Sequence, residues 1–434
     1  MTARYRVTPV STVGGRIRVP GDKSISHRSL MLGGIASGVT EVTGFLSSAD
    51  CLATLEAQRR MGVRVELLGP NHLRVHGVGA KGLSAPAQDL DMGNAGTAIR
   101  LFMGLLAGQS FASTLTGDAS LRKRPMERVA GPLRLMGAHI DTTEGKPPVR
   151  IRPVARLQSI DYALPMASAQ VKSAVLLAAL RAEGTTHVTE PAPTRDHTER
   201  MLEAFGVTVR REPGQVWLAG GQSLAGAPIS VPGDISSAAF FIVAGAIAGL
   251  PGFTIENVGI NPTRTGVLDI LRLMGADIRL HPREGAGAEP TADIEVRASG
   301  LKGIRVPEEL VPLAIDEFPI LFIAAACAEG ETVVTGAEEL RVKESDRLAV
   351  MAEGLTRLGI PNELQPDGIR IQGGHRFRGG VVDSHGDHRV AMSFAVASLR
   401  SEGEILVEDV ENVATSFPGF VEVARAAGLE VSLA

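Results

Sequence analysis

The sequence predicts an α/β protein of two similar domains, each made of three repeated βαβαββ units. Three observations carry this prediction. A glycine flanked by apolar residues recurs six times after a helical pattern, a strongly apolar helix recurs once per repeat, and short strand-like runs lie between the helices. Regular self-similarity of this kind is typical of proteins assembled from one repeated supersecondary unit.

The recurring glycines mark predicted helix ends. Each one follows Met, Phe, Leu or Ala and precedes an alternating, strand-like run such as Val63-Arg-Val-Glu66. Glycine suits the left-handed position just after a helix, because it has no Cβ to clash there. The six glycines are Gly62, Gly137, Gly206, Gly275, Gly359 and Gly428.

A second helix in each repeat is predicted to be buried. Stretches such as Val175–Leu180 and Ala238–Ala244 are apolar on nearly every side, which is typical of a helix inside a core. Strand-rich runs such as Thr332–Thr335 and Ile405–Val407 separate the two kinds of helix. The predicted buried helices span residues 22–37, 94–107, 168–182, 234–248, 316–328 and 387–399.

The domain division follows from a repeated phrase. Val-Pro-Gly-Asp occurs at 19–22 and again at 231–234, and the two copies divide the six repeats three and three. We therefore predict crossovers near 19–22 and 231–234, one domain of residues 22–231 and another of residues 1–21 plus 232–434. An open solenoid also fits the period, but the last repeat reaches full length only when residues 1–21 complete it. Compact domains are therefore favoured.

Composition excludes several classes of protein. The 434 residues carry a net charge of -4 and only 4% aromatic residues, which argues against a globally basic nucleic-acid binder. No stretch is apolar and long enough to span a membrane, and the N-terminal segment lacks the apolar core of a signal peptide. Cys51 and Cys327 are predicted to be buried, reduced thiols. We expect a soluble cytoplasmic protein with no membrane or nucleic-acid partner.

Basic residues gather at the beginnings of the predicted helices. A cation is unfavourable at a helix N-terminus, so helix stability alone would not place it there, whereas an anionic ligand would. Equivalent turns of a repeat lie on one side of each domain, which predicts an anion-binding cleft between two such faces. His197 and His388 have no third ligand at a matching spacing, so we predict no metal. The basic residues are Lys23, Arg28, Arg100, Arg122, Lys123, Arg124, Lys172, Arg195, Arg264, Lys343, Arg347 and Arg389.

Two acidic residues stand inside this basic field. Asp316 opens a predicted buried helix, and Glu344 lies between Lys343 and Arg347. Either carboxylate could simply balance charge. The functional alternative is proton transfer, because a carboxylate positioned in a cleft commonly acts as a general acid or base.

A series of motifs in order gives the sequence its family resemblance. The motifs are Gly21-Asp-Lys-Ser-Ile-Ser-His-Arg28, Asn94-Ala-Gly-Thr97, Arg124-Pro125, Ser168-Ala-Gln-Val-Lys172, Arg195-Asp-His-Thr-Glu199, Asn261-Pro-Thr-Arg264, Arg341-Val-Lys-Glu-Ser-Asp-Arg347 and Asp387-His-Arg389. With these motifs, which run from Pro20 to the Thr415–Pro418 segment, the chain resembles the 5-enolpyruvylshikimate-3-phosphate (EPSP) synthases. Ser-Ala-Gln-x-Lys, Arg-x-His-x-Glu and Asn-x-Thr-Arg resemble the class II branch.

The resemblance implies a fold and a reaction. The fold would be the inside-out barrel of enolpyruvyl transferases, with two domains of three repeats. The enzyme would be a monomeric transferase of the shikimate pathway, which leads to chorismate and the aromatic amino acids. It would move the enolpyruvyl group of phosphoenolpyruvate to the 5-hydroxyl of shikimate 3-phosphate through a tetrahedral intermediate and release phosphate. No cofactor and no metal would be needed.

The resemblance also implies the site residues. Asp316 would take the hydroxyl proton, and Glu344 and Lys23 are candidates for proton exchange at C3 of phosphoenolpyruvate. Shikimate 3-phosphate would be held by Lys23, Ser24, Arg28, Ser168, Ala169, Gln170, Arg195, Asp316 and Lys343. Phosphoenolpyruvate would be held by Lys23, Gly96, Arg124, Gln170, Arg347 and Arg389.

Two departures bear on the inhibitor glyphosate. Thr415 stands where many class I members have Lys, and Gly96 stands where insensitive members often carry Ala. The missing methyl at Gly96 leaves room for a bulkier inhibitor, whereas the class II motifs point to insensitivity. We therefore expect an intermediate response.

Two alternatives to this function stay open at the level of sequence. The related UDP-N-acetylglucosamine enolpyruvyl transferases usually have a loop cysteine near the Arg-Pro turn, and Leu121–Pro125 has none. A non-catalytic anion-binding protein on the same scaffold is the other alternative. Phosphate release from phosphoenolpyruvate with shikimate 3-phosphate, with the UDP-sugar or with neither would distinguish these three functions.

Overall fold

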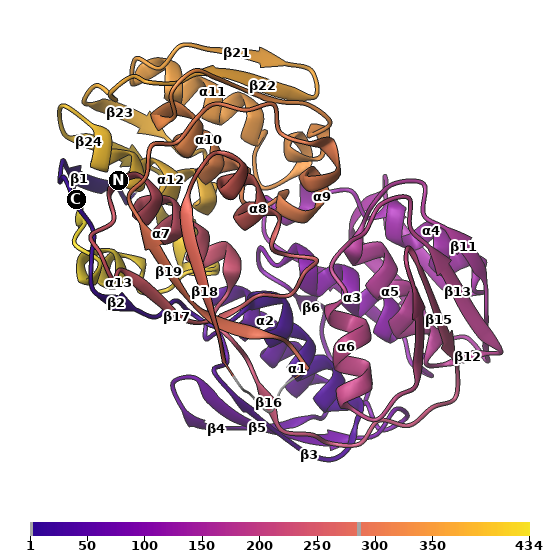
Figure 1. Ribbon diagram of the computed structural model, residues 1–434. Coiled ribbons are helices and arrows are strands. Elements are labelled where there is room, and N and C mark those ends of the chain that lie inside the picture. Colours follow the sequence, from indigo (N-terminus) through magenta and orange to yellow (C-terminus); the bar gives the residue numbers. More distant parts are fainter. Residues whose placement is uncertain (1–2, 284–287) are drawn as a thin grey trace. The chain divides into compact units, whose positions relative to one another are not determined.

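The computed structural model describes residues 3–283 and 288–434, and these divide into two compact units. Unit 1 contains residues 3–20, 232–283 and 289–434, and unit 2 contains residues 21–231 with Ala288. The chain passes between the units at Pro20–Gly21 and at Val231–Pro232. In Figure 1, unit 2 runs from indigo to magenta and most of unit 1 is orange and yellow. Each unit has its own hydrophobic core.

The six buried helices lie where the repeat predicts them. Every residue of the fourth, α7, is buried, as its uniformly apolar sequence requires. The third, α5, ends three residues before the predicted boundary, because Ala182–Glu183 forms a strand instead. The buried helices are α1 (Lys23–Ile35), α3 (Gly96–Leu106), α5 (Ala169–Ala179), α7 (Ile235–Ala248), α10 (Phe318–Cys327) and α12 (His388–Ala397).

The six recurring glycines each follow the other helix of their repeat, not the buried one, as predicted. Their φ angles lie between 82° and 102°, in the left-handed region that a residue with a Cβ rarely adopts. The prediction of a glycine-terminated helix in each repeat is therefore confirmed. These helices are α2 (Ala49–Arg60), α4 (Glu127–Leu135), α6 (His197–Ala204), α8 (Gly266–Leu273), α11 (Arg347–Arg357) and α13 (Phe420–Ala426).

Unit 2 contains three small mixed sheets of four strands, each with one parallel pair at its edge, and a separate two-stranded pair. The first sheet has the order β16 (Ile229–Ser230), β3 (Ser37–Thr43), β5 (His72–Val78), β4 (Arg64–Gly69). The second is β6 (Leu90–Asp91), β7 (Ser113–Thr116), β9 (Lys146–Arg152), β8 (His139–Thr143). The third is β11 (Asp161–Ala163), β13 (Thr185–Thr189), β15 (Gln215–Ala219), β14 (Val209–Glu212), and β10 (Leu157–Gln158) pairs with β12 (Ala182–Glu183).

Unit 1 repeats the arrangement with two four-stranded sheets and one of three strands. The fourth sheet has the order β18 (Asp277–Arg283), β19 (Thr291–Arg297), β17 (Thr254–Gly259), β2 (Arg16–Ile17). The fifth is β20 (Glu331–Val334), β22 (Gly368–Gln372), β21 (Asn362–Gln365). The sixth is β23 (Gly380–Asp383), β24 (Ile405–Glu408), β1 (Tyr5–Thr8), β25 (Glu430–Leu433).

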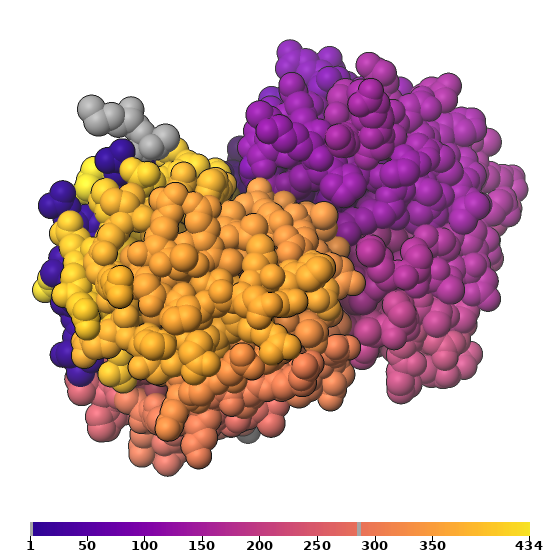
Figure 2. Space-filling model, turned by 90° about the horizontal axis from the view of Figure 1, so that it is seen from above, coloured from indigo at the N-terminus to yellow at the C-terminus, as the bar shows by residue number. Residues whose placement is uncertain are grey.

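The N-terminal strands close two repeats rather than one. Strand β1 pairs with β24 and β25 and completes the sixth sheet, as expected from the short last repeat. Figure 2 shows these indigo N-terminal atoms among yellow C-terminal ones. Strand β2, however, pairs with β17 in the fourth sheet. The expectation that residues 1–21 belong entirely to the sixth repeat is therefore wrong.

Short helical turns connect the remaining elements. One α-helical turn, α9 (Val311–Ala314), precedes α10. Cys51 is buried and Cys327 is partly exposed, so the expectation of two buried thiols holds for one of them. Within the described ranges, no helix is long and apolar enough to cross a membrane. The 3-10 turns are η1 (Leu121–Lys123), η2 (Glu308–Leu310), η3 (Glu338–Val342), η4 (Ser398–Arg400) and η5 (Glu411–Thr415).

Candidate active-site clusters

In unit 2, Lys23 opens α1 directly after its cap. Asp22 caps the helix by accepting a hydrogen bond from the amide of Ile25 at 2.9 Å. The Lys23 ammonium lies 3.0 Å from Oδ2 of Asp50, in the first turn of α2. This carboxylate holds a cation at a position where the α1 dipole alone would disfavour it.

Arg28 connects three helices from inside the unit. Its guanidinium donates to the hydroxyls of Thr198 on α6 at 2.7 Å and Ser173 on α5 at 2.9 Å. It also donates to the carbonyl of Ser24 at 2.9 Å, and the residue is only 4% exposed. These contacts hold α1 against α5 and α6. The role of Arg28 as a ligand of shikimate 3-phosphate stays a prediction.

A second group of predicted residues meets at the starts of α3 and α5. Arg100 donates to Oε1 of Gln170 at 2.6 Å, and Gln170 donates to the Thr97 hydroxyl at 3.1 Å. Arg124 donates to Oδ1 of Asn94 at 2.5 Å. A Cβ at Gly96 would lie 2.9 Å from Nη1 of Arg124. The structure therefore brings together Gly96, Arg124 and Gln170, with Arg100 fixing the amide.

Lys172 has a different environment from the other basic residues. Its ammonium lies 2.8 Å from Glu190 and 2.8 Å from Glu199, and its side chain is 2% exposed. Burial by itself would lower the pKa of Lys172, but the carboxylates of Glu199 and Glu190 outweigh it and raise the pKa. The sequence grouped Lys172 with cations placed for a ligand, whereas the structure gives it two interior carboxylates as partners.

The remaining predicted residues of unit 2 stand at helix starts. Ser168 caps α5, its hydroxyl accepting a hydrogen bond from the amide of Val171. Ala169 is the first residue of α5, and Arg195 precedes the Asp196 cap position of α6. Ser24 is the second residue of α1. All four are partly exposed.

In unit 1, four predicted residues form one charged cluster. Oδ1 of Asp316 lies 3.5 Å from the Lys343 ammonium and 3.4 Å from the Arg347 guanidinium. Arg347 donates to Glu344 at 2.6 Å and to Asp387 at 2.8 Å. The Asp316 and Glu344 side chains keep 15% and 23% of their surface exposed, so both carboxylates can be reached from solvent.

The charge of Arg347 depends on these carboxylates. Its side chain is 1% exposed, and burial by itself would lower its pKa. Asp387, Glu344 and Asp316 outweigh that effect and raise the pKa above its usual range. Arg347 is therefore a fixed cation whose guanidinium is oriented from three sides.

Arg389, the last predicted residue, lies in the first turn of α12. Its guanidinium is 3.9 Å from Oε1 of Glu317, and its side chain is 11% exposed. The side chain of Asp387 caps α12 by accepting from the Arg389 amide at 2.9 Å. Sequence reasoning missed the carboxylates of Asp50, Asp387 and Glu317. The one signal in the sequence that could have indicated these carboxylates is their position at or beside a predicted helix start.

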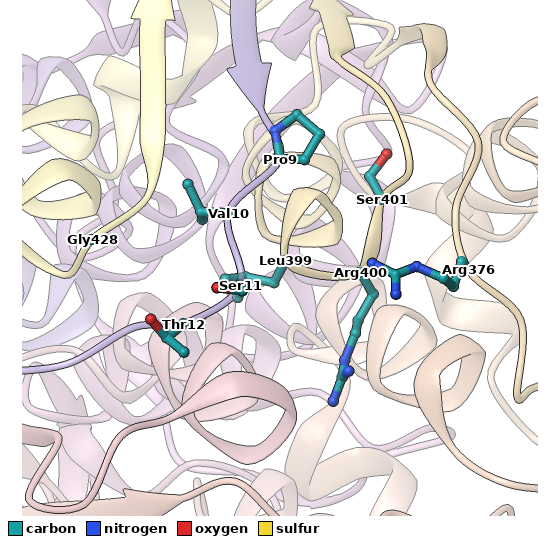
Figure 3. A pocket seen from close by; sticks show the side chains of 9 residues that line it. All are labelled: Pro9, Val10, Ser11, Thr12, Arg376, Leu399, Arg400, Ser401 and Gly428. Atoms are coloured by element: carbon teal, nitrogen blue, oxygen red, sulfur yellow. The ribbon is translucent and has the colours of Figure 1, made fainter.

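A separate pocket in unit 1 contains none of the predicted residues. It encloses about 610 Å³ between residues 9–12 and the Arg376 and Leu399–Ser401 segments. In Figure 3, the guanidinium groups of Arg376 and Arg400 lie apart and point in different directions. That of Arg400 donates to the carbonyl of Ile247 at 2.7 Å, near the end of α7. Arg400 is thus engaged in holding the fold together.

Comparison with known proteins identifies the family. The family model described as EPSP synthase (3-phosphoshikimate 1-carboxyvinyltransferase) matches residues 7–424. The chain belongs to this family. Its activity is that of a 3-phosphoshikimate 1-carboxyvinyltransferase, a transferase of the shikimate pathway.

Individual relatives match over nearly the whole length. The 3-phosphoshikimate 1-carboxyvinyltransferase of Methylococcus capsulatus is 62% identical over 431 residues, covering 99% of this chain and 98% of the relative. That of Alkalilimnicola ehrlichii is 59% identical, covering 99% and 96%. A solved EPSP synthase structure from Acinetobacter baumannii is 56% identical with a TM-score of 0.89, covering 100% of both chains. The mixed α/β EPSP synthase fold is therefore established.

His27 makes the cation-rich start of α1 sensitive to acid. The ring is completely buried, and its Nδ1 lies 2.7 Å from the Thr54 hydroxyl. Burial, and then the cations of Lys23 and Arg28, hold the pKa of His27 well below its usual range. The native state therefore keeps this ring neutral while the unfolded chain protonates it near pH 6.5.

We predict that His27→Gln flattens the loss of stability below pH 6.5. A lowered histidine pKa contributes stability above the unfolded pKa and loses it as pH falls. At pH 5.5 the wild type should lose about 1.4 kcal/mol through this residue. Urea unfolding of both proteins at pH 7.5 and 5.5 measures the difference. Equal losses in the two proteins would contradict the assignment of the pH dependence to His27.

Proposed function

We propose that the protein joins phosphoenolpyruvate to shikimate 3-phosphate by addition and elimination, using the residues that the family resemblance implies. The 5-hydroxyl oxygen attacks C2 of phosphoenolpyruvate while C3 gains a proton. The resulting tetrahedral intermediate loses a C3 proton and phosphate, leaving the enolpyruvyl ether. Both substrates carry several negative charges, which matches the clustered cations at the helix starts.

One observation carries the proposal: the Asp316 carboxylate lies within 3.5 Å of two cations, Lys343 and Arg347. The two cations fix its position and compensate its charge. We assign Asp316 to take the hydroxyl proton and Glu344, hydrogen-bonded to Arg347 at 2.6 Å, to exchange protons at C3 together with Lys23.

The cations supply binding and electrostatic stabilisation. In unit 2, Lys23, Ser24, Arg28, Ser168, Ala169, Gln170 and Arg195 would bind shikimate 3-phosphate, while Gly96 and Arg124 join Lys23 and Gln170 for phosphoenolpyruvate. In unit 1, Asp316 and Lys343 would bind the first substrate, and Arg347 and Arg389 the second. Anchored guanidinium groups stabilise charge that develops in the transition state without first having to reorganise.

The finer assignments belong to the same proposal. We place the chain in class II on its Ser-Ala-Gln-x-Lys and Arg-x-His-x-Glu motifs. A cytoplasmic location and a monomeric state, which the family resemblance implies, belong to the same proposal. We also propose that the chain divides into two domains at 19–22 and 231–234. Each domain would have three repeats in the inside-out barrel arrangement.

The reaction is tested by phosphate release. Phosphoenolpyruvate with shikimate 3-phosphate should release phosphate, whereas phosphoenolpyruvate alone or with UDP-N-acetylglucosamine should not. Release with the UDP-sugar would favour the related transferase. No release with any acceptor would favour a binding protein.

We predict that Asp316→Asn and Glu344→Gln keep substrate binding but lose turnover by about 10²-fold or more, because each removes a proton-transfer group. Steady-state kcat and binding of shikimate 3-phosphate by calorimetry are the measurements. Near-normal turnover in either variant would remove that residue from the proton-transfer steps.

We also predict that Gly96→Ala weakens glyphosate binding. The new methyl would lie 2.9 Å from Nη1 of Arg124 and 3.4 Å from Nη1 of Arg100, so the Arg124 guanidinium must move. The inhibition constant should rise at least about tenfold, with a smaller rise in KM for phosphoenolpyruvate. Identical inhibition constants in both proteins would refute the steric argument.

A further inference from the structure

Asp316 and Glu317 are adjacent but face different cations. Asp316 lies beside Lys343 and Arg347, whereas Glu317 lies 3.8 Å from Arg264 and 3.9 Å from Arg389. Two neighbouring carboxylates at the start of one buried helix thus serve four cations. Glu317 has had no role in the reaction described so far.

The Glu317 side chain is 1% exposed and lies among three helix starts. Oε1 accepts a hydrogen bond from the Ser236 hydroxyl in the first turn of α7. Arg264 donates to the same hydroxyl at 2.6 Å and lies 3.2 Å from Asp234. Glu317 therefore belongs to a buried network that ends at Arg389.

The carboxylate is not used to cap its own helix. Glu317 occupies the cap position of α10, yet its side chain makes no capping hydrogen bond. Among the described residues, no hydrogen-bond partner reaches its buried Oε2. Burying a carboxylate costs several kcal/mol, so stability alone is a weak reason for one here.

We propose that Glu317 is a positioning residue for Arg389. Its charge holds the guanidinium in the orientation that receives the anionic groups of phosphoenolpyruvate. The backbone of Arg389 is fixed separately by Asp387, so Glu317 acts on the side chain alone. This inference rests on the proposed function, in which Arg389 binds phosphoenolpyruvate.

The test is a split between the kinetic constants of Glu317→Gln, which keeps the shape and removes the charge. A loosened Arg389 should raise KM for phosphoenolpyruvate on the order of tenfold. The values of kcat and of KM for shikimate 3-phosphate should stay within about twofold. An unchanged KM for phosphoenolpyruvate, or an equal rise in both KM values, would overturn the proposal.

A double-mutant cycle shows whether the effect passes through Arg389. In an Arg389→Lys background, adding Glu317→Gln should change KM for phosphoenolpyruvate by less than about twofold. Fully multiplicative effects would overturn the positioning role. If Glu317→Gln does not fold, Glu317→Asp keeps the charge on a shorter side chain. It should raise the same KM about threefold when Arg389 is present and leave it unchanged in the Arg389→Lys background; any other pattern counts against the proposal.

Controls separate this inference from the proposed function. Glu353→Gln makes the same chemical change at an exposed pair with Arg357 on α11 and should leave all constants within about twofold. If the wild type releases no phosphate from the two substrates, the proposed function fails. If the wild type is active and Glu317→Gln matches Glu353→Gln, only the positioning role fails.

Discussion

The pairing of buried cations with interior carboxylates is an interaction on which both units depend. Lys172 lies between Glu190 and Glu199, and Arg347 lies among Asp316, Glu344 and Asp387. Exposed pairs such as Arg18–Glu256 contribute at most about 1 kcal/mol, whereas removing one partner of a buried pair costs about 3–5 kcal/mol. The interior pairs therefore fix the positions of Lys172 and Arg347, whereas surface pairs contribute little to the placement of their side chains.

Features of the fold that depend on local sequence could be predicted, and features that depend on distant pairing could not. The helix that ends at a recurring glycine and the apolar helix in each repeat both follow from nearby residues alone. Strand β2 is two residues long and exists because Arg16–Ile17 pairs with Thr254–Ile255 far along the chain. A strand of two residues is too short to show the alternation of apolar and polar residues that predicts strands. The prediction therefore assigned this segment to the wrong repeat.

The candidate site divides in the same way. Cations at helix starts are recognisable because the helix dipole disfavours them, so each needs an external reason to be there. The position of a cation at a helix start does not show whether a bound ligand or an interior carboxylate compensates its charge. For Lys172, two interior carboxylates do so. Its partner Glu190 lies eighteen residues away along the chain, and the Glu317–Arg389 contact joins separate helices. Only the packing of the repeats brings these groups together.

The motifs that carry the family resemblance thus combine residues predicted to bind substrate with residues that hold the fold together. Within Ser168–Lys172, the serine caps α5, Gln170 is held by Arg100 and Thr97, and Lys172 pairs with the last residue of the Arg195–Glu199 motif. A change at Lys172 alone would leave two buried carboxylates without their cation, so it requires a compensating change in the second motif. Interior ion pairs therefore join motifs that are distant in sequence, and a match to one motif constrains the other.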